Sequence, residues 1–507
     1  MNTERPTFDL LVVGGGINGV GSALDAAGRG LKVMLCEMND LGSATSSNSS
    51  KLIHGGLRYL EHYEFRLVRE SLAEREVMIK KAPHIVRPLR FRLPHQPHLR
   101  PAWMIRAGLF LYDHLSTRTT LAGSHNIQFS ADSPLKAGIK KGFEYSDGWV
   151  DDARLVVLNA VAAREKGADI RTRTRCIKAV REQNMWQVTL EHQITGDTEV
   201  VYARALINAS GPWVSKLFDS ALASPAPQNV RLVKGSHIVV PRLHDEAEAY
   251  ILQNEDDRIV FVIPFEDDFS LIGTTDVDYQ GDPSQVAISE EETDYLIEIA
   301  NSYFKQQINS RDIVTTYSGV RPLLDDESDS AQAVTRDYTL ELDDGNGRAP
   351  LLSIFGGKIT TYRKLAEAAI DRISQYFPQA TGTWTETAPL PGGEFTDKES
   401  LKVSLGRVYP WLPEALTTRL VRSYGTLSHQ ILDGAKSLED LGQHYGAGLY
   451  QREVDYLITR EWTHTLEDLI WRRTKLGLRL SAEQCHDLEN YLTGNRTPQQ
   501  RANDSHH

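Results

Sequence analysis

Residues 8–19 read FDLLVVGGGING, an apolar run that passes at once into three glycines. The apolar part suits a strand that is buried on both faces. Gly14, Gly16 and Gly19 follow the spacing G-x-G-x-x-G, in which each glycine has a separate purpose. The first permits a tight turn, the second lets the backbone approach a pyrophosphate, and the third lets helix and strand pack closely. This stretch predicts the first strand and turn of a dinucleotide-binding α/β unit.

The residues after the glycines complete that unit. Residues 17–29 have helical spacing, Gly30 ends the helix, and residues 31–36 (LKVMLC) form a second apolar strand. The N-terminus of such a helix offers free N–H groups and a partial positive charge to a phosphate. Glu37, directly after the second strand, can accept hydrogen bonds from ribose hydroxyls. The motif predicts a dinucleotide site, but alone it does not distinguish NAD from FAD.

Two later segments favour FAD and a nucleotide domain built from separate parts of the chain. Residues 205–211 (ALINASG) run from an apolar strand into small residues that leave room for a flat ligand. Residues 351–361 (LLSIFGGKITT) give a strand, a glycine turn and a helix start, with helical spacing to Ile370. That helix N-terminus could stabilise negative charge near N1 and the C2 carbonyl of a flavin. Each segment alone fits an ordinary strand-to-helix turn, whereas the three motifs together indicate FAD.

A further stretch, residues 44–61 (ATSSNSSKLIHGGLRYLE), lies between these pieces. With it, the chain resembles the FAD-dependent, membrane-associated (aerobic) glycerol-3-phosphate dehydrogenase family, and the match looks close to the bacterial type. The resemblance extends from the first strand to at least Arg363. The segments that carry it are VVGGGINGVG (12–21), TSSNSSKLIHGGLRYLE (45–61), FEYSDGWVDDARL (143–155), VKGSHIVVP (233–241), IGTTDVDYQGDP (272–283), YSGVRPL (317–323) and FGGKITTYRKLAE (355–367).

The resemblance implies an activity, a cofactor and partners. This family oxidises sn-glycerol 3-phosphate to dihydroxyacetone phosphate by hydride transfer from C2 to flavin N5, and electrons pass through FAD to a membrane quinone. We therefore expect FAD as cofactor and glycerol 3-phosphate as substrate. We expect a cytoplasmic enzyme bound peripherally to the anionic inner face of the cytoplasmic membrane. A homodimer is also expected, although the sequence itself carries no measure of oligomeric state.

A small dianion with a secondary alcohol needs cations for its phosphate and a proton acceptor for its hydroxyl. By resemblance, the substrate cations are Arg58, Arg321 and Lys358, with Tyr59 and Thr360 as supporting hydroxyl groups. An arginine can hold a phosphate through two parallel N–H bonds. A solvated surface charge is the ordinary alternative for each cation.

The proton acceptor is the least determined role. His237, in KGSHIVVP, is the favoured candidate because the unperturbed pKa of a histidine lies near neutrality. A hydrogen-bonded structural histidine is an equal alternative. His54 is the second candidate, although its place suggests a contact with the cofactor. Arg321 could also assist by stabilising the alkoxide.

The predicted FAD contacts combine the three motifs with the hydroxyl-rich loop at residues 45–50. Hydroxyl groups there could bond the pyrophosphate or the flavin, or could belong to an ordinary polar loop and helix cap. The resemblance favours FAD contacts in this loop, mostly through the backbone. The complete set is Gly14, Gly15, Gly16, Ile17, Asn18, Gly19, Glu37, Met38, Thr45, Ser46, Ser50, Lys51, Leu52, His54, Ala209, Gly211, Gly357, Lys358, Ile359 and Thr360.

Composition narrows the class of protein. The 507 residues contain 56 Lys and Arg against 68 Asp and Glu, a net charge of −12 that argues against a dedicated nucleic-acid binder. Cys36, Cys176 and Cys485 share no metal-ligand spacing and cannot form a disulfide framework, so we expect no metal site and a reducing compartment. Residues 1–8 lack the features of a signal peptide, and no run approaches the roughly 18 apolar residues of a membrane span.

A basic stretch stands out in this acidic chain. Residues 87–106 (RPLRFRLPHQPHLRPAWMIR) hold five arginines and no acid, and lead into WMIRAGLFLYDHL (103–115). Basic side chains beside apolar ones suit docking on anionic lipid headgroups. A loop followed by a half-buried helix explains the same residues equally well.

We expect an α/β protein of three domains. They are a discontinuous FAD-binding Rossmann-like domain, a mixed β-sheet substrate-binding domain and a helical C-terminal domain. The helical domain is expected because helical spacing recurs through the last hundred or so residues. The FAD-binding domain is expected to take residues 1–80, 145–230 and 340–388. The substrate-binding domain is expected to take residues 81–144 and 231–339, and the helical domain residues 394–507.

Two other functions fit parts of the sequence. A related flavin oxidase acting on an amine or amino acid with O₂ would need one carboxylate-binding arginine, not several cations for a phosphate. A flavin redox sensor that signals by binding a partner would hold FAD without turning over a small alcohol. The several cations within the motifs favour the dehydrogenase over both.

Overall fold

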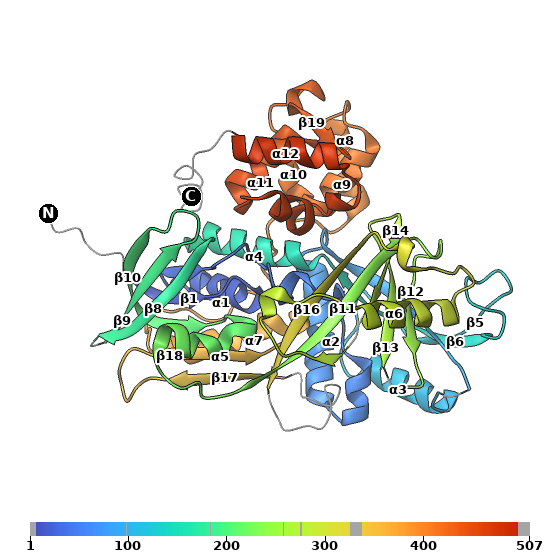
Figure 1. Ribbon diagram of the computed structural model, residues 1–507, viewed down its shortest axis with the longest axis horizontal. Coiled ribbons are helices and arrows are strands. Elements are labelled where there is room, and N and C mark those ends of the chain that lie inside the picture. The colour runs from blue at the N-terminus through green and yellow to red at the C-terminus, as the bar shows by residue number, and fades with distance from the viewer. Residues whose placement is uncertain are drawn as a thin grey trace.

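The structure, a computed structural model, describes residues 7–97, 99–182, 184–256, 258–273, 276–324 and 337–494. The side chains of Arg58, Glu61 and His62 are outside this description. The described residues form two large β-sheets with their helices, and a helical C-terminal region (Figure 1). Among their helices, none is both long enough and apolar enough to cross a membrane.

The first sheet has the predicted dinucleotide unit at its centre. β1 (Thr7–Val13) lies between β2 (Val33–Cys36) and β10 (Thr198–Asn208) and pairs with both in parallel. The order is β17-β18-β10-β1-β2-β7, and β8 and β9 extend the sheet from β10. The remaining strands are β7 (Asp169–Arg171), β8 (Thr174–Glu182), β9 (Met185–His192), β17 (Tyr338–Asp343) and β18 (Leu351–Gly356).

Both faces of the first sheet are covered. Leu10 and Val12 of β1 pack with α1 (Ile17–Gly28), α4 (Asp152–Glu165) and α7 (Tyr362–Ser374) on one face. Leu11 and Val13 pack on the other face with β8, β9 and the short helix α5 (Val214–Leu217). The expectation of a first strand buried on both faces is therefore confirmed.

The second sheet is mixed, because β12 pairs with β4 in parallel and the remaining ladders are antiparallel. α6 (Glu290–Tyr303) packs on one face, and α2 (Phe65–Lys81) and α3 (Ala102–His114) on the other. Its strands are β3 (Leu52–Ile53), β4 (Val86–Pro94), β5 (His125–Gln128), β6 (Lys141–Val150), β11 (Val230–Pro241), β12 (Ala249–Gln253), β13 (Ile259–Phe265), β14 (Phe269–Gly273), β15 (Val277–Asp278) and β16 (Thr315–Leu324).

The C-terminal region is helical, as expected, and lies at the top of Figure 1 in orange and red. It shares one hydrophobic cluster with α1 and α4, so it is packed against the helical face of the first sheet. Its elements are α8 (Lys398–Val408), α9 (Glu414–Tyr424), α10 (Ser428–Leu432), α11 (Gln451–Glu461), α12 (Ala482–Gly494) and the hairpin β19 (His444–Gly446) with β20 (Leu449–Tyr450). The fold class is confirmed, and the domain boundaries stay a prediction.

Gly19 allows α1 to pack directly on the end of β1, because a Cβ at this position would lie 1.9 Å from the carbonyl oxygen of Gly14. We expect Gly19→Ala to push helix and strand apart and to lower the free energy of unfolding by about 1–3 kcal/mol. Chemical denaturation measures this loss.

Gly406 provides the matched control, since it lies inside α8 and, apart from its chain neighbours and the adjacent backbone of α8, no described heavy atom lies within 4 Å of its Cβ position. Gly406→Ala should raise the free energy of unfolding by about 0.5–1 kcal/mol through helix propensity. Equal effects of the two substitutions would contradict the packing argument.

Candidate active site

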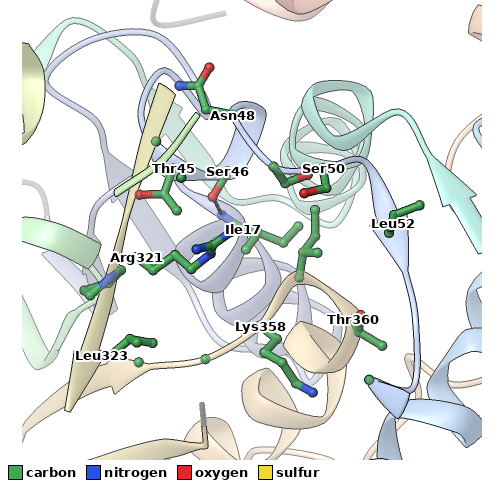
Figure 2. A pocket seen from close by; sticks show the side chains of 18 of the residues that line it. Ile17, Thr45, Ser46, Asn48, Ser50, Leu52, Arg321, Leu323, Lys358 and Thr360 are labelled. Carbon is green, nitrogen blue, oxygen red and sulfur yellow. Dashed lines mark hydrogen bonds between the residues drawn. The ribbon is translucent and has the colours of Figure 1, made fainter. Parts of the chain in front are cut away.

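A cavity of about 1670 Å³ begins where the parallel strands of the first sheet end and continues to the second sheet (Figure 2). Its wall includes residues that follow β1, β2, β10 and β18 at their carboxyl ends. Ligands of open α/β sheets bind at these strand ends. The cavity therefore lies where the topology predicts a ligand, and the second sheet closes its far side.

The glycine turn keeps one wall of the cavity free of side chains. Gly14 has a φ of +113°, and a Cβ on it would lie 2.5 Å from the carbonyl oxygen of Ala209. The N–H of Ile17, at the start of α1, donates to Ser46 Oγ at 3.0 Å. Gly16, which precedes it, also lines the cavity. Backbone N–H groups and a hydroxyl group thus meet at a helix N-terminus, which suits a phosphate.

Glu37 follows β2 and is fixed by the backbone around it. Its carboxylate accepts hydrogen bonds from Gly15 N–H at 2.7 Å and from Asn39 N–H at 2.8 Å. Burial raises the pKa of Glu37, and these two N–H bonds oppose the rise. The carboxylate lines the cavity next to the glycine turn, where an acceptor for ribose hydroxyls is expected.

The turn after β18 lies against the glycine turn, although the two are far apart in sequence. Asn18 Nδ2 donates to the carbonyl oxygen of Gly356 at 3.2 Å. Gly356 and Gly357 have φ values of +75° and +100°, which favour glycine at both positions. Thr360 is buried, and its Oγ1 accepts a hydrogen bond from the backbone N–H of His54 at 3.3 Å. This turn therefore connects the dinucleotide motif to the stretch around residue 54.

Two predicted cations line the cavity from different elements, Arg321 from β16 and Lys358 from the turn after β18 (Figure 2). Arg321 forms an ion pair with Asp276. Lys358 Nζ donates to Ser71 Oγ at 3.1 Å and lies 4.5 Å from the centroid of the Tyr59 ring. The positive charges are thus held in place by neighbours within one cavity, as the substrate prediction requires.

His237 does not line the cavity. Its ring is buried, is stacked on Tyr317 at 4.7 Å, and lies 2.9 Å from Ser50 Oγ through Nε2. Burial, together with the charges of Arg321 and Lys51, holds the pKa of His237 well below its usual range. His237 is therefore a buried imidazole that contacts Ser50 from outside the cavity, and the geometry does not support a direct contact between His237 and the substrate.

Lys51 is also turned away from the cavity. Its Nζ forms a buried ion pair with Asp152 at 2.8 Å and donates to Ser47 O at 3.1 Å. Its φ of +59° lies in the left-handed region, where a non-glycine residue is uncommon. Lys51 thus stabilises the hydroxyl-rich loop from behind.

Most of the predicted site residues meet in the cavity. Gly15, Gly19, Lys51 and His237 are not among its lining residues, and the side chain of Arg58, in the 3₁₀ segment Leu57–His62, is outside the described residues. The predicted residues that line the cavity are Gly14, Gly16, Ile17, Asn18, Glu37, Met38, Thr45, Ser46, Ser50, Leu52, His54, Tyr59, Ala209, Gly211, Arg321, Gly357, Lys358, Ile359 and Thr360. Their individual roles stay predictions.

The sequence reasoning missed two features of the cavity. Asp276, the ion-pair partner of Arg321, lies in the quoted segment IGTTDVDYQGDP but carried no local signal of a role. An apolar arm of the cavity was also missed, because it is assembled from separate strands and a helix. Its wall includes Phe91, Leu93, Met104, Ile105, Leu111, Ile251, Ile259 and Phe261.

The glycine-lined wall, the helix N-terminus and the volume of the cavity fit a flat dinucleotide cofactor. This combination places the chain in the class of FAD-dependent oxidoreductases, and the family model of that description matches residues 9–363. A second model, described as the C-terminal domain of alpha-glycerophosphate oxidase, matches residues 383–488.

Relatives and a solved structure refine this class. The chain is 60% identical over 486 residues to a glycerol-3-phosphate dehydrogenase of Pseudomonas aeruginosa, covering 96% of this chain and 95% of the relative. It is 52% identical over 483 residues to a D-erythritol 1-phosphate dehydrogenase of Brucella abortus, covering 94% and 96%. The structure of a Bacillus halodurans glycerol-3-phosphate dehydrogenase complexed with FAD matches with a TM-score of 0.77 and 26% identity, covering 100% and 94%.

The chain belongs to the FAD-dependent glycerol-3-phosphate dehydrogenase family, and its cofactor is FAD. The resemblance seen in the sequence is thereby confirmed.

Proposed function

We propose that the chain oxidises sn-glycerol 3-phosphate to dihydroxyacetone phosphate and passes the electrons through FAD to a membrane quinone. The observation that carries this proposal is the continuity of one cavity from the dinucleotide turn at Gly14 to the cations Arg321 and Lys358. The Pseudomonas relative, which matches 96% of this chain, supports the same substrate by its name.

The phosphate of the substrate binds, in this proposal, between Arg321 and Lys358. A guanidinium has five N–H donors in a fixed fork, so one edge can hold Asp276 while another meets a phosphate oxygen. The Lys358 ammonium, placed by Ser71 and Tyr59, adds a second positive charge. Arg58 is a third candidate by resemblance. These contacts fix the polyol so that C2 is oriented for oxidation.

We assign the proton acceptor to His54, which lines the cavity, rather than to His237. Bound FAD would supply the hydride acceptor, so the chain's own residues must orient the alcohol and accept its proton. The bond from the backbone N–H of His54 to Thr360 Oγ1 holds the main chain of His54 beside the turn that precedes α7. His237, whose lowered pKa disfavours the imidazolium form, instead holds the Ser50 hydroxyl.

Anaerobic addition of glycerol 3-phosphate should bleach the flavin absorbance at about 450 nm, because the substrate reduces the bound cofactor. In Arg321→Met, the half-saturating concentration for this bleaching should rise about ten- to a hundredfold, since a hydrogen bond to a charged group contributes about 1.5–3 kcal/mol. Stopped-flow absorbance measures both.

Arg231→Met is the matched control, because Arg231 lies in the same sheet, forms an ion pair with Asp278, and does not line the cavity. Its half-saturating concentration should equal that of the unsubstituted protein. An Arg321→Met variant that behaves like the Arg231→Met control would contradict the phosphate assignment.

D-erythritol 1-phosphate is a second candidate substrate, because the Brucella relative named for it is 52% identical to this chain. Both compounds offer a phosphate and a polyol to the same cations. Faster bleaching by D-erythritol 1-phosphate would transfer the proposal to the four-carbon substrate. Bleaching only by an amine or amino acid would favour the oxidase. Bleaching by neither the polyol phosphates nor an amine or amino acid would favour the redox sensor.

His54→Asn should slow flavin reduction by about 10²–10⁴-fold, the usual contribution of a general base. His237→Asn should slow it by about tenfold or less, because Asn can still hydrogen-bond Ser50. Reduction rates at saturating substrate test this difference, with thermal denaturation as the control for folding. A larger loss in His237→Asn than in His54→Asn would return the role of proton acceptor to His237.

We further propose that α3 docks the protein on the anionic inner face of the cytoplasmic membrane. Trp103 and Phe110 are 69% and 57% exposed and lie seven residues apart, on one face of the helix. Met104 and Leu111, also exposed, line the apolar arm of the cavity. An apolar helix face beside an apolar arm suits a lipid-soluble quinone.

The basic stretch contributes less to this surface than its sequence indicates. Arg90 and Arg92 both form ion pairs with Glu144, which lies across from them in the second sheet. Arg87 packs over the Trp149 ring, 4.8 Å from its centroid. Docking is therefore assigned to the apolar side chains of α3. The cytoplasmic location and the homodimer rest on the resemblance alone and stay predictions.

The double substitution Trp103→Ser with Phe110→Ser should reduce binding to anionic vesicles by about tenfold or more, since each aromatic ring loses its apolar contact with lipid. Quinone reduction in vesicles should fall with it, while reduction of a soluble dye should not change. The control is Val403→Ser with Val408→Ser on α8, which removes two side chains of similar exposure at 53% and 56%. Equal vesicle binding by both double variants would contradict the docking proposal.

A further inference from the structure

The loop between β2 and the 3₁₀ segment Thr45–Ser47 has a second, buried side. Glu37, Met38 and Asn39 of this loop line the cavity. Asp40, the next residue, is buried, and its carboxylate meets the C-terminal region rather than the cavity. The loop that carries the predicted ribose-binding carboxylate is thus in contact with a part of the chain more than four hundred residues away.

Two consecutive arginines hold Asp40. Arg472 Nε donates to Asp40 Oδ2 at 2.6 Å, and Arg473 donates to Oδ2 at 2.9 Å and to Oδ1 at 2.7 Å. Arg473 also donates to the carbonyl oxygen of Glu461 at 2.6 Å, which ties it to the end of α11. A carboxylate that accepts three guanidinium N–H bonds has little freedom to move.

A second aspartate closes the contact into a ring. Arg472 Nη2 donates to Asp468 Oδ1 at 2.6 Å, and Asp468 accepts two bonds from Arg173 Nη2 at 2.7 and 2.8 Å. The N–H of Arg173 donates to the carbonyl oxygen of Asn39 at 3.0 Å. The three arginines hold the pKa of Asp468 well below its usual range, although burial opposes this. The loop is therefore held by hydrogen bonds at two neighbouring residues, to the backbone carbonyl of Asn39 and to the side-chain carboxylate of Asp40.

We propose that Arg472 and Arg473 are positioning residues for FAD, through which the C-terminal region fixes loop 37–42 and keeps the Glu37 carboxylate at the ribose end of the cofactor. The proposal rests on the assignment of Glu37 to the ribose. The link from Asp40 to Glu37 is short, because Asn39 N–H donates directly to Glu37 Oε1 at 2.8 Å. Movement of Asp40 displaces Asn39 and with it the carboxylate.

A purely structural role would lower stability without a specific effect on FAD, so the test compares two buried carboxylates. Asp40→Asn removes the charge that Arg472 and Arg473 share. Glu453→Gln removes an equally buried partner of an arginine, since Glu453 accepts bonds from Arg419 at 2.7 and 2.6 Å within the C-terminal region. Glu453 does not line the cavity, and each substitution removes one buried carboxylate charge that faces an arginine.

The measurement is the dissociation constant of FAD, obtained from flavin fluorescence on reconstitution of the apoprotein well below the melting temperature of each variant. Asp40→Asn should raise this constant tenfold or more, while Glu453→Gln should leave it within twofold of the unsubstituted protein. Both variants should lose thermal stability. An FAD constant within twofold in Asp40→Asn, or an equal rise in both variants, would overturn the proposal.

Arg472→Lys keeps the positive charge but lacks the fork that joins Asp40 to Asp468. It provides the second test if Asp40→Asn does not fold, and it should raise the FAD dissociation constant about threefold or more. An unchanged constant in Arg472→Lys would count against the proposal. Because FAD binding is measured without substrate, failure of this proposal is distinguishable from failure of glycerol 3-phosphate to reduce the flavin.

Discussion

The close approach of three backbone segments at Gly14, Gly19 and Ala209 is the constraint on which the cavity depends. A Cβ at Gly19 would lie 1.9 Å from Gly14 O, and one at Gly14 would lie 2.5 Å from Ala209 O. The ends of β1 and β10 and the start of α1 therefore meet without side chains between them. The wall assigned to the cofactor phosphates is made of backbone N–H groups and hydroxyl groups, which is the chemistry that an anion requires.

The second sheet gives the same cavity two different ends. Arg321 reaches it from β16, while Phe91 and Phe261 contribute to an apolar arm that leads toward α3. Charge is concentrated where a phosphorylated polyol is proposed to bind, and apolar surface where a lipid-soluble acceptor is proposed to arrive. The two half-reactions of the proposed dehydrogenase are thus assigned to parts of the cavity wall that differ in polarity.

The glycine turn, its flanking strands and Glu37 could be predicted from the sequence, because their geometry is determined within about thirty residues. Contacts between distant segments could not. His237 is paired with Ser50, 187 residues away, and nothing near His237 in the sequence indicates its burial. Arg90 resembles a free surface cation until β6 is placed beside β4, because Glu144, 54 residues away, then accepts a hydrogen bond from its guanidinium. The ion pair between Lys51 and Asp152 could not be predicted for the same reason, because the two residues are far apart in the sequence.

The bonds between Asp40 and the pair Arg472 and Arg473 also impose an order on biosynthesis. During translation, the segment with the glycine turn leaves the ribosome more than four hundred residues before the two arginines. A nascent chain can therefore form the first sheet and still lack the groups that secure loop 37–42. With the positioning role proposed for Arg472 and Arg473, tight capture of the flavin nucleotide begins only after both arginines have been synthesised.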